Sequence, residues 1–233
     1  METTKQKKFI SALSAAFPLT IPVLTGFLVL GMAYGMLMQT KGYGTLWAML
    51  MSAVAFCGSM QFVAITLLTA VFDPLQAFWL SLMVNARHLF YGVSMLEKYK
   101  GLGKIRAFLI FALCDETFSI ASGCLPPKGV DRKYFYLSIS LLDYLYWILG
   151  TFLGSVLGGL ISFNTEGLDF VLTALFAVLL LEQMKLRENR VFAVIGLACA
   201  GVALGVFGAD RLVIPAMGLI LFVLLAGRKK LCR

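Results

Sequence analysis

A polar cluster lies in the middle of an otherwise apolar stretch of the chain. The segment from Leu75 to Met95 carries Asn85, Arg87 and His88 near its centre. An arginine at the depth of a bilayer is costly, and an ionisable residue there marks a functional site by default when a partner can be named. The stretch therefore predicts a site built around a guanidinium that is held away from water.

Carboxylates that can pair with this arginine follow in the next two apolar stretches. Asp115 and Glu116 are adjacent in the first stretch, and Asp143 lies in the second. Desolvation and a neighbouring like charge both favour the protonated form of a carboxyl group, so we expect Asp115 or Glu116 to carry a proton during the work cycle. The alternative is that the two side chains, about 100° apart on a helix, face different surroundings.

Helical spacing arranges these residues in stripes. The i, i+4, i+7 spacing places Ser81, Asn85 and His88 on one face of a helix, and Arg87 shares a neighbouring face with Tyr91. Similar stripes run through the next two stretches, at Asp115, Ser119 and Ser122 and at Ser140, Asp143, Trp147 and Gly150. Three helices with inward polar stripes would enclose a hydrated or ligand-filled cavity.

Two interpretations of Arg87 stay open at this point. It either pairs with Asp115, Glu116 or Asp143 and only locks helices together, or it anchors an anionic group of a ligand. Three acids against one arginine and one histidine leave the acids in excess. At least one acid must then be protonated or must pair with another cation.

The remaining polar candidates also have two interpretations. His88 is the only histidine of the chain, and it suits a proton relay as well as a hydrogen-bonded position in the core. Tyr91 and Gln61 are candidate ligand contacts. A lone glutamine in a membrane helix is, in the simpler interpretation, a hydrogen-bonding link between helices.

The cysteines predict neither a metal site nor a disulfide framework, because no CxxC pair occurs and no histidine lies at ligand spacing. We expect them to be small buried apolar side chains, and we expect no cofactor. They are Cys57, Cys114, Cys124, Cys199 and Cys232.

Composition sets the fold class. Hydrophobic residues make up 60% of the chain and charged residues 14%, against about 45–50% and about 25% in soluble domains. Although the net charge is +8, the basic residues lie mostly in short loops and at the termini, where they act as topology signals, so nucleic-acid binding is not expected. The composition predicts an all-α, polytopic helical bundle in a lipid bilayer.

Eight apolar stretches predict about seven or eight transmembrane helices in a single integral membrane domain over residues 1–233. Two of the stretches, the sixth and the eighth, are short for a crossing. The stretches are Phe17–Met38, Leu46–Phe72, Leu75–Met95, Ile105–Leu125, Tyr134–Ile161, Leu168–Leu181, Val191–Phe207 and Leu212–Ala226.

The loop charges test this topology. With the N-terminal lysines in the cytoplasm, eight crossings place most basic loops inside and the acidic pair Glu166 and Asp169 outside, as the positive-inside rule expects. The loop from Lys98 to Arg106 disagrees, because it would face outward. Either this loop is tolerated, or one of the first four stretches is re-entrant or broken.

Glycine spacing predicts close helix packing. Gly58 beside Gln61 marks a weak point at which the second stretch is expected to break. A glycine-striped span followed by an aromatic-containing one occurs at Gly26–Phe62 and again at Gly150–Phe176, which suggests two repeated halves. The GxxxG patterns are Gly31 with Gly35, Gly150 with Gly154 and Gly158, and Gly201 with Gly205.

Several short motifs carry a likeness to a known family. They are Phe17-Pro18, Gly31-Met32-Ala33-Tyr34-Gly35, Ala55-Phe56-Cys57-Gly58-Ser59-Met60-Gln61-Phe62, Val84-Asn85-Ala86-Arg87-His88-Leu89-Phe90-Tyr91-Gly92 and Asp115-Glu116-Thr117-Phe118. Together they resemble the AzlC family, the large subunits of bacterial branched-chain amino-acid exporters, and the likeness extends over most of the chain.

The resemblance implies a multi-pass permease of the bacterial plasma membrane. Its substrates would be branched-chain or similar apolar amino acids moved outward, and it would work with a small membrane subunit of the AzlD type. An ion gradient is the expected energy source, because nothing in the chain resembles a nucleotide-binding P-loop.

The polar residues suit a zwitterion. Arg87 with Asn85 can hold the carboxylate through charge-assisted bonds, a carboxylate can hold the ammonium, and a broken helix near Gly58 would add backbone groups. The predicted substrate-binding residues are Asn85, Arg87, His88, Tyr91, Gln61 and Asp143, and the predicted proton-coupling residues are Asp115 and Glu116.

Three other functions are weighed against this one. If the chain were a non-catalytic subunit, its partner would form the transport path. If it were a channel, transport would not saturate with substrate. An intramembrane enzyme would use His88 and an acid, but the chain has neither a GxSxG nor an HExxH motif. We therefore expect no enzymatic activity.

Overall fold

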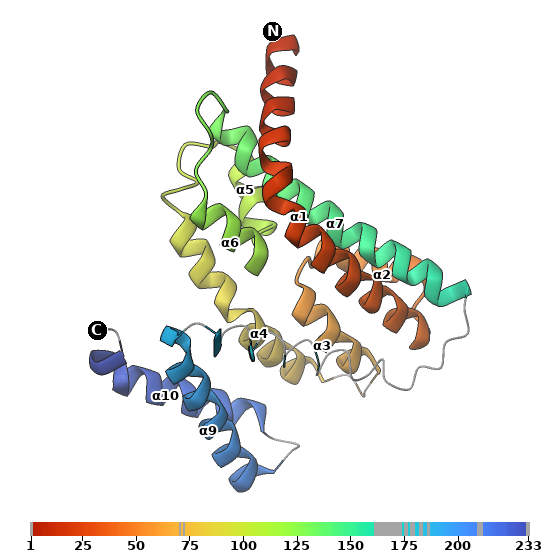
Figure 1. Ribbon diagram of the computed structural model, residues 1–233. Coiled ribbons are helices and arrows are strands. Elements are labelled where there is room, and N and C mark those ends of the chain that lie inside the picture. The colour runs from red at the N-terminus through yellow and green to blue at the C-terminus, as the bar shows by residue number, and fades with distance from the viewer. Residues whose placement is uncertain are drawn as a thin grey trace. The chain divides into compact units, whose positions relative to one another are not determined.

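The computed structural model describes residues 2–69, 71, 73–160, 187–208 and 212–231, with isolated positions between 174 and 185. These residues form helices and turns without any strand (Figure 1), so the all-α prediction is confirmed. They divide into two compact units, Met1–Asp169 and Phe170–Arg233, and the candidate site residues lie in the first.

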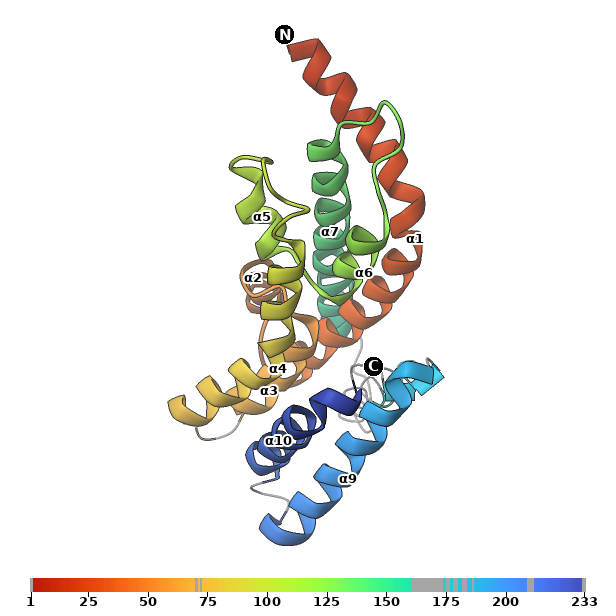
Figure 2. The same ribbon diagram turned by 90° about the vertical axis from the view of Figure 1, so that its left-hand side faces the viewer.

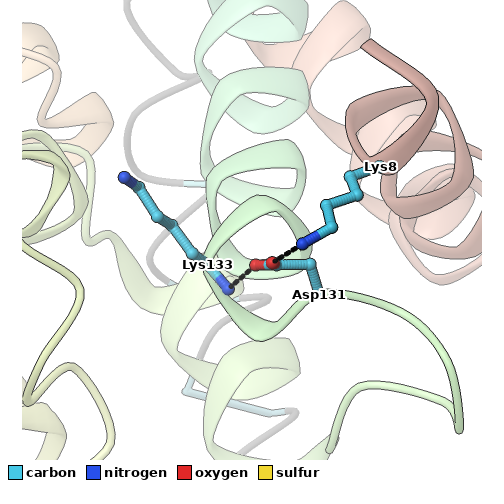
Figure 3. A network of polar contacts seen from close by, with 3 residues as sticks. All are labelled: Lys8, Asp131 and Lys133. Atoms are coloured by element: carbon cyan, nitrogen blue, oxygen red, sulfur yellow. Dashed lines mark hydrogen bonds and ion pairs between the residues drawn. The ribbon is translucent and has the colours of Figure 1, made fainter. Parts of the chain in front are cut away.

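Two long helices, α1 (Glu2–Thr40) and α7 (Arg132–Leu160), are the longest elements of the first unit. They run side by side in the same direction, as both views show (Figures 1 and 2). At their N-terminal ends Lys8 Nζ lies 3.5 Å from Asp131 Oδ2, and Asp131 Oδ1 accepts a 3.0 Å hydrogen bond from the backbone N–H of Lys133 (Figure 3).

The glycines explain how closely these helices approach. A Cβ atom on Gly150 would lie 2.6 Å from the backbone oxygen of Phe27, and one on Gly31 would lie 3.0 Å from the backbone nitrogen of Thr151. Gly154 likewise packs against the backbone of Met32. Without side chains at these points the backbones come into contact, as the GxxxG patterns of both stretches predicted.

The second predicted stretch is broken, as expected near Gly58. It forms α2 (Thr45–Val54) and α3 (Gly58–Thr69), with Phe56 between them at a φ of 38°. A left-handed backbone is unfavourable for phenylalanine, but the side chain is buried and packs on Tyr144, 5.1 Å between ring centroids. The Tyr43 hydroxyl donates to Leu68 O at 3.0 Å, so the first arm starts where the second arm ends, and the two form a helical hairpin.

The fourth predicted stretch, Ile105–Leu125, was expected as one span, and that expectation is wrong. It forms α5 (Ile105–Phe111) and α6 (Asp115–Gly123). Lys98, just after α4 (Pro74–Met95), donates to Ala121 O at 2.9 Å and to Ser122 O at 2.6 Å at the end of α6. The chain therefore returns to the end from which α5 starts, as a second hairpin.

The two hairpins enter from opposite ends of the unit. Arg132, at the start of α7, donates to the backbone oxygens of Glu97 and Lys98, so α4 runs opposite to α7. The tips meet at Tyr144, which contacts Phe56 of the first hairpin and, at 5.9 Å between ring centroids, Phe108 of the second. A hairpin followed by a long helix thus occurs twice in opposite orientation, which is the arrangement of an inverted repeat.

The sequence carries this repeat once the structure shows where to align it. Asp73 and Asp131 each accept a hydrogen bond from the N–H two residues later, at 2.9 and 3.0 Å. Asn85 stands as far after Asp73 as Asp143 stands after Asp131. Matching motifs precede and form the hairpins: Lys41-Gly42-Tyr43-Gly44 with Lys100-Gly101-Leu102-Gly103, and Ala55-Phe56-Cys57 with Ala112-Leu113-Cys114. The repeat predicted at Gly26–Phe62 and Gly150–Phe176 lies partly outside the described residues.

The hairpins also resolve the conflict in the loop charges. The 98–106 loop lies at the same end of the unit as the N-terminus, because neither hairpin crosses to the other end. In the described part of the opposite end, the charged side chains are Lys41 and Asp73. The basic residues gathered at the N-terminal end are Lys5, Lys7, Lys8, Lys98, Lys100, Lys104, Arg106, Lys128, Arg132 and Lys133.

Three described helices meet both length and hydropathy criteria for a membrane span, at Lys5–Thr40, Arg132–Leu160 and Arg190–Phe207. Helix α4, with 22 residues, is about 33 Å long but is not among these three helices. In the second unit, α9 (Arg190–Phe207) is the third of these helices and confirms the seventh stretch, whereas α10 (Val213–Leu231) covers the eighth but contains only a short apolar segment, Gly218–Gly227. Most of the sixth, Leu168–Leu181, lies outside the described residues.

Candidate functional site

Arg87 links the two hairpins at the point where their second arms begin. Its Nη1 lies 2.7 Å from Oδ2 of Asp115, the first residue of α6, and its Nη2 donates to Oγ of Ser59, in the first turn of α3, at 2.7 Å. One guanidinium on α4 therefore holds both hairpin tips. This contact is the ion pair that the first interpretation of Arg87 predicted, in which the arginine locks helices together. Its partner is Asp115.

The pair is not sealed. The side chains of Arg87 and Asp115 keep 36% and 31% of their surface accessible. Three atoms around them have no hydrogen-bond partner among the described residues: Arg87 Nε, Asp115 Oδ1 and Asn85 Oδ1. The unpartnered atoms are themselves buried, whereas other parts of the Arg87 and Asp115 side chains are accessible, so a ligand can approach the pair from that side.

The two helix starts differ in charge. The first N–H groups of a helix have no partner within it and attract negative charge. Asp115 and Glu116 occupy the first turn of α6, whereas the first turn of α3 has no acidic residue. An anionic group of a ligand is therefore favoured at α3 beside Ser59, and a cationic group at the carboxylates of α6.

An aromatic wall flanks the ion pair. Tyr91 stacks on Phe118 with 4.5 Å between ring centroids, and the His88 ring lies 5.7 Å from the Tyr91 ring. His88 Nδ1 is 3.3 Å from the backbone oxygen of Asn85, one turn earlier on α4. The histidine is thus hydrogen-bonded to its own helix, and Tyr91 is the closer of the two to α6.

Gln61 belongs to a separate hydrogen-bond network. Its Oε1 accepts from Trp147 Nε1 at 2.8 Å, and its Nε2 donates to Ser52 Oγ at 3.0 Å. Ser52 is in turn 2.8 Å from Thr151 Oγ1. Gln61 is fully buried, so the structure places it as a link between α2, α3 and α7 and does not bring it to Arg87.

Asp143 lies behind the ion pair rather than in it. Its side chain has no exposed surface, and its Oδ2 accepts a 2.7 Å hydrogen bond from the hydroxyl of Thr117 on α6. Glu116 interacts electrostatically with both Asp115 and Asp143. The three predicted acids therefore gather around the start of α6, but Asp115 is the one that meets the arginine.

Sequence reasoning missed three residues of this region. Ser59 and Thr117, in the first turns of α3 and α6, are partners of Arg87 and Asp143, and Tyr144 lies between the tips. Hydroxyl residues in apolar stretches are common, so only the break positions could have singled them out. The described residues contain no group of three His, Cys, Asp or Glu residues that could hold a metal ion.

Comparison with known proteins places the chain among membrane proteins. Residues 22–161 match the family described as AzlC protein. The branched-chain amino acid transport protein AzlC of Bacillus subtilis is 46% identical over 97% of this chain and 89% of its own. An uncharacterized membrane protein of Helicobacter pylori is 42% identical over 96% and 98%, and inner membrane protein YgaZ of Escherichia coli is 27% identical over 79% and 79%. No solved structure matches.

Proposed function

Because this chain belongs to the AzlC family, as its motifs indicated, we propose that it is a membrane permease that moves branched-chain or similar small apolar amino acids out of the cell. The B. subtilis relative is named as a transport protein for branched-chain amino acids. The observation that carries the proposal here is the accessible contact of Arg87 with both Ser59 and Asp115.

A zwitterionic amino acid can exchange places with this ion pair. Its carboxylate takes the Arg87 guanidinium and the Ser59 hydroxyl at the start of α3, and its ammonium takes the Asp115 carboxylate. Each charge then keeps an opposite partner, so binding leaves no buried charge unpaired. Charge-assisted bonds of the bidentate kind that arginine makes suit a carboxylate.

The flanking residues complete the substrate site. Asn85, with its unpartnered Oδ1, is a further contact for the ammonium group. Tyr91, stacked on Phe118 with His88 beside it, is the apolar wall on which a branched side chain would pack. Gln61 acts by holding the first hairpin against α7.

The charge distribution supports an orientation in the plasma membrane. The N-terminal end of the first unit, with its ten basic residues, faces the cytoplasm in this proposal because basic loops are retained there. The first hairpin then enters from outside and the second from inside. Such opposed hairpins can expose the site to one side at a time, as inverted repeats do in other secondary transporters.

Ion gradients are the proposed energy source, and a small membrane subunit of the AzlD type is the proposed partner. We propose no enzymatic activity, because the B. subtilis relative is named as a transport protein. The partner would complete the assembly in the bilayer, whereas Arg87 and Asp115 of this chain would bind the substrate.

Uptake of radiolabelled leucine and valine into inverted membrane vesicles tests this function. Vesicles from cells that express the chain, with and without the small subunit, should accumulate label under a pH gradient or a Na⁺ gradient. The Arg87→Gln variant should reach the membrane and lose the uptake, whereas Arg106→Gln, at the basic end, should keep it. Equal uptake by the Arg87→Gln variant would contradict the proposed site.

A further inference from the structure

Asp143 is a sealed carboxylate with half of its hydrogen-bonding capacity unused. The side chain is fully buried, Oδ2 accepts from Thr117, and Oδ1 has no partner among the described residues. Ser140, one turn earlier on α7, is also fully buried, and its Oγ likewise has no partner. Two oxygens on one face of α7 are therefore desolvated without compensation, which native structures rarely tolerate.

The charges around Asp143 do not neutralise it. It interacts with Glu116 of α6 and with Cys114 just before that helix, which add negative charge or none. Helix α1 has no ionisable side chain between Lys8 and Tyr34. On α4, the Arg87 guanidinium is engaged by Asp115. Since an isolated buried carboxylate is very costly, the described surroundings call for a bound cation.

The inverted repeat has a neutral residue at the position equivalent to Asp143. Asn85 occupies the equivalent position on α4, and its Oδ1 also lacks a partner. An amide has nearly the same shape as a carboxylate, so the first half builds the same position with a neutral residue. The second half keeps an acid there at the cost of desolvating it.

We propose that Asp143, with the hydroxyls of Thr117 and Ser140, binds the monovalent cation whose gradient drives transport, either a proton or Na⁺. The inference rests on the proposed function and assigns its coupling ion to a residue. A carboxylate and two hydroxyls are hard oxygen ligands. Thr117 lies beside the break between α5 and α6, 3.1 Å from Cys114 Sγ, and broken helices supply carbonyls to coupling ions in other transporters.

Burial separates this site from the substrate site. Arg87 and Asp115 are each about one third exposed, enough for an amino acid to reach them, whereas Asp143 has no exposed surface. A proton or a dehydrated Na⁺ can enter where an ammonium group on a side-chain-bearing carbon cannot. The cation therefore binds behind the start of α6, where it can alter the hairpin that holds Asp115.

Two transport assays on the protein reconstituted together with the small subunit test the assignment. Leucine counterflow, with leucine on both sides and no gradient, needs only the substrate site. Accumulation against a leucine gradient, driven by a pH gradient in one arm and by a Na⁺ gradient in the other, needs the cation as well. The Asp143→Asn variant, which copies the residue of the first half, should keep counterflow and lose driven accumulation. Asp131→Asn, at the start of the same helix, should keep both.

Each result has a defined meaning. The arm that drives the wild-type protein identifies the cation. Driven accumulation by Asp143→Asn, or loss of its counterflow while the protein stays monodisperse, would overturn the assignment. Absence of counterflow in the wild type would instead reject the proposed function. If Asp143→Asn does not fold, Asp143→Glu should shift the cation concentration that half-saturates transport, and an unchanged value would overturn the assignment.

A binding readout keeps the assignment testable whatever the substrate is. A ligand that binds only the folded state raises its melting temperature. The purified wild-type protein should gain thermal stability either from Na⁺ at fixed pH, with choline as the control, or from lower pH without Na⁺. This gain should be lost in Asp143→Asn and kept in Asp131→Asn. Equal gains in all three proteins would contradict the site.

Discussion

Arg87 and Asp115 are joined by a 2.7 Å ion pair between Nη1 and Oδ2, and the same guanidinium reaches Ser59 of the other hairpin. One side chain of α4 thus connects two helical hairpins that enter from opposite ends of the unit. A ligand that replaces the ion pair changes this connection directly. A ligand shifts the balance between conformations only if it binds one of them more tightly than the other. Because Arg87 holds both hairpin tips, a ligand that replaces its contacts would bind with different affinity when the tips are together and when they are apart.

Ser59→Ala should weaken substrate binding without abolishing it. The hydroxyl is one neutral partner of Arg87, and loss of a hydrogen bond to a charged group costs about 1.5–3 kcal/mol, or roughly 10- to 150-fold in the dissociation constant. Binding of labelled leucine to the purified protein measures this change. Ser119→Ala, on the exposed face of α6, should leave the dissociation constant unchanged. An equal effect of both substitutions would count against a role for Ser59.

Cysteine labelling should distinguish the hairpins from continuous spans. In a background without native cysteines, Lys100→Cys should be protected from a membrane-impermeant maleimide in intact cells, while Lys41→Cys should react. Eight continuous crossings would put both positions outside. The opposite result is that Lys100→Cys is labelled in intact cells, with the labelling prevented only when the maleimide is quenched before it is added. That result would refute the re-entrant second stretch or the cytoplasmic N-terminus.

Gly154→Leu should disrupt the first unit. Its new side chain would meet the backbone of Met32 on α1, and overpacking of this kind costs roughly 3 kcal/mol or more because backbone atoms cannot move aside cheaply. Gly26→Leu is the matched control, since a Cβ atom there meets nothing within 4 Å. The thermal stability and the monodisperse fraction in detergent should fall for Gly154→Leu alone. Similar stability of both variants would show that the α1 and α7 contact is looser.

Hydropathy predicted the crossing helices but not the second hairpin. The stretch Leu75–Met95 corresponds to α4 (Pro74–Met95), and Tyr134–Ile161 corresponds to α7 (Arg132–Leu160). In both cases the length of the apolar stretch sets the length of the helix. A re-entrant hairpin buries the same kinds of residue as a span. The break at Ala112–Cys114 contains neither proline nor glycine, so nothing local announced it, whereas Gly58 did mark the first break.

The site was predicted in outline for a similar reason. A buried arginine needs a partner, which made Asp115, Glu116 and Asp143 candidates at once. Sequence could not choose among them, because the choice depends on where the second hairpin turns. The turn brings Asp115 to Arg87 and buries Asp143 behind it. The equivalence of Asn85 and Asp143 became visible only after the two capping aspartates fixed the alignment.

The central claim is that Arg87 and Asp115 bind the substrate and do more than hold helices together. Leucine binding by three purified proteins tests it: wild type, Arg87→Gln and the neutral pair Arg87→Gln with Asp115→Asn. A single substitution leaves a partly buried charge unpaired, and the double substitution removes that cost. We predict that the double variant regains the thermal stability lost by Arg87→Gln but does not bind leucine. Recovery of leucine binding together with stability would show that the pair is structural and would contradict the account.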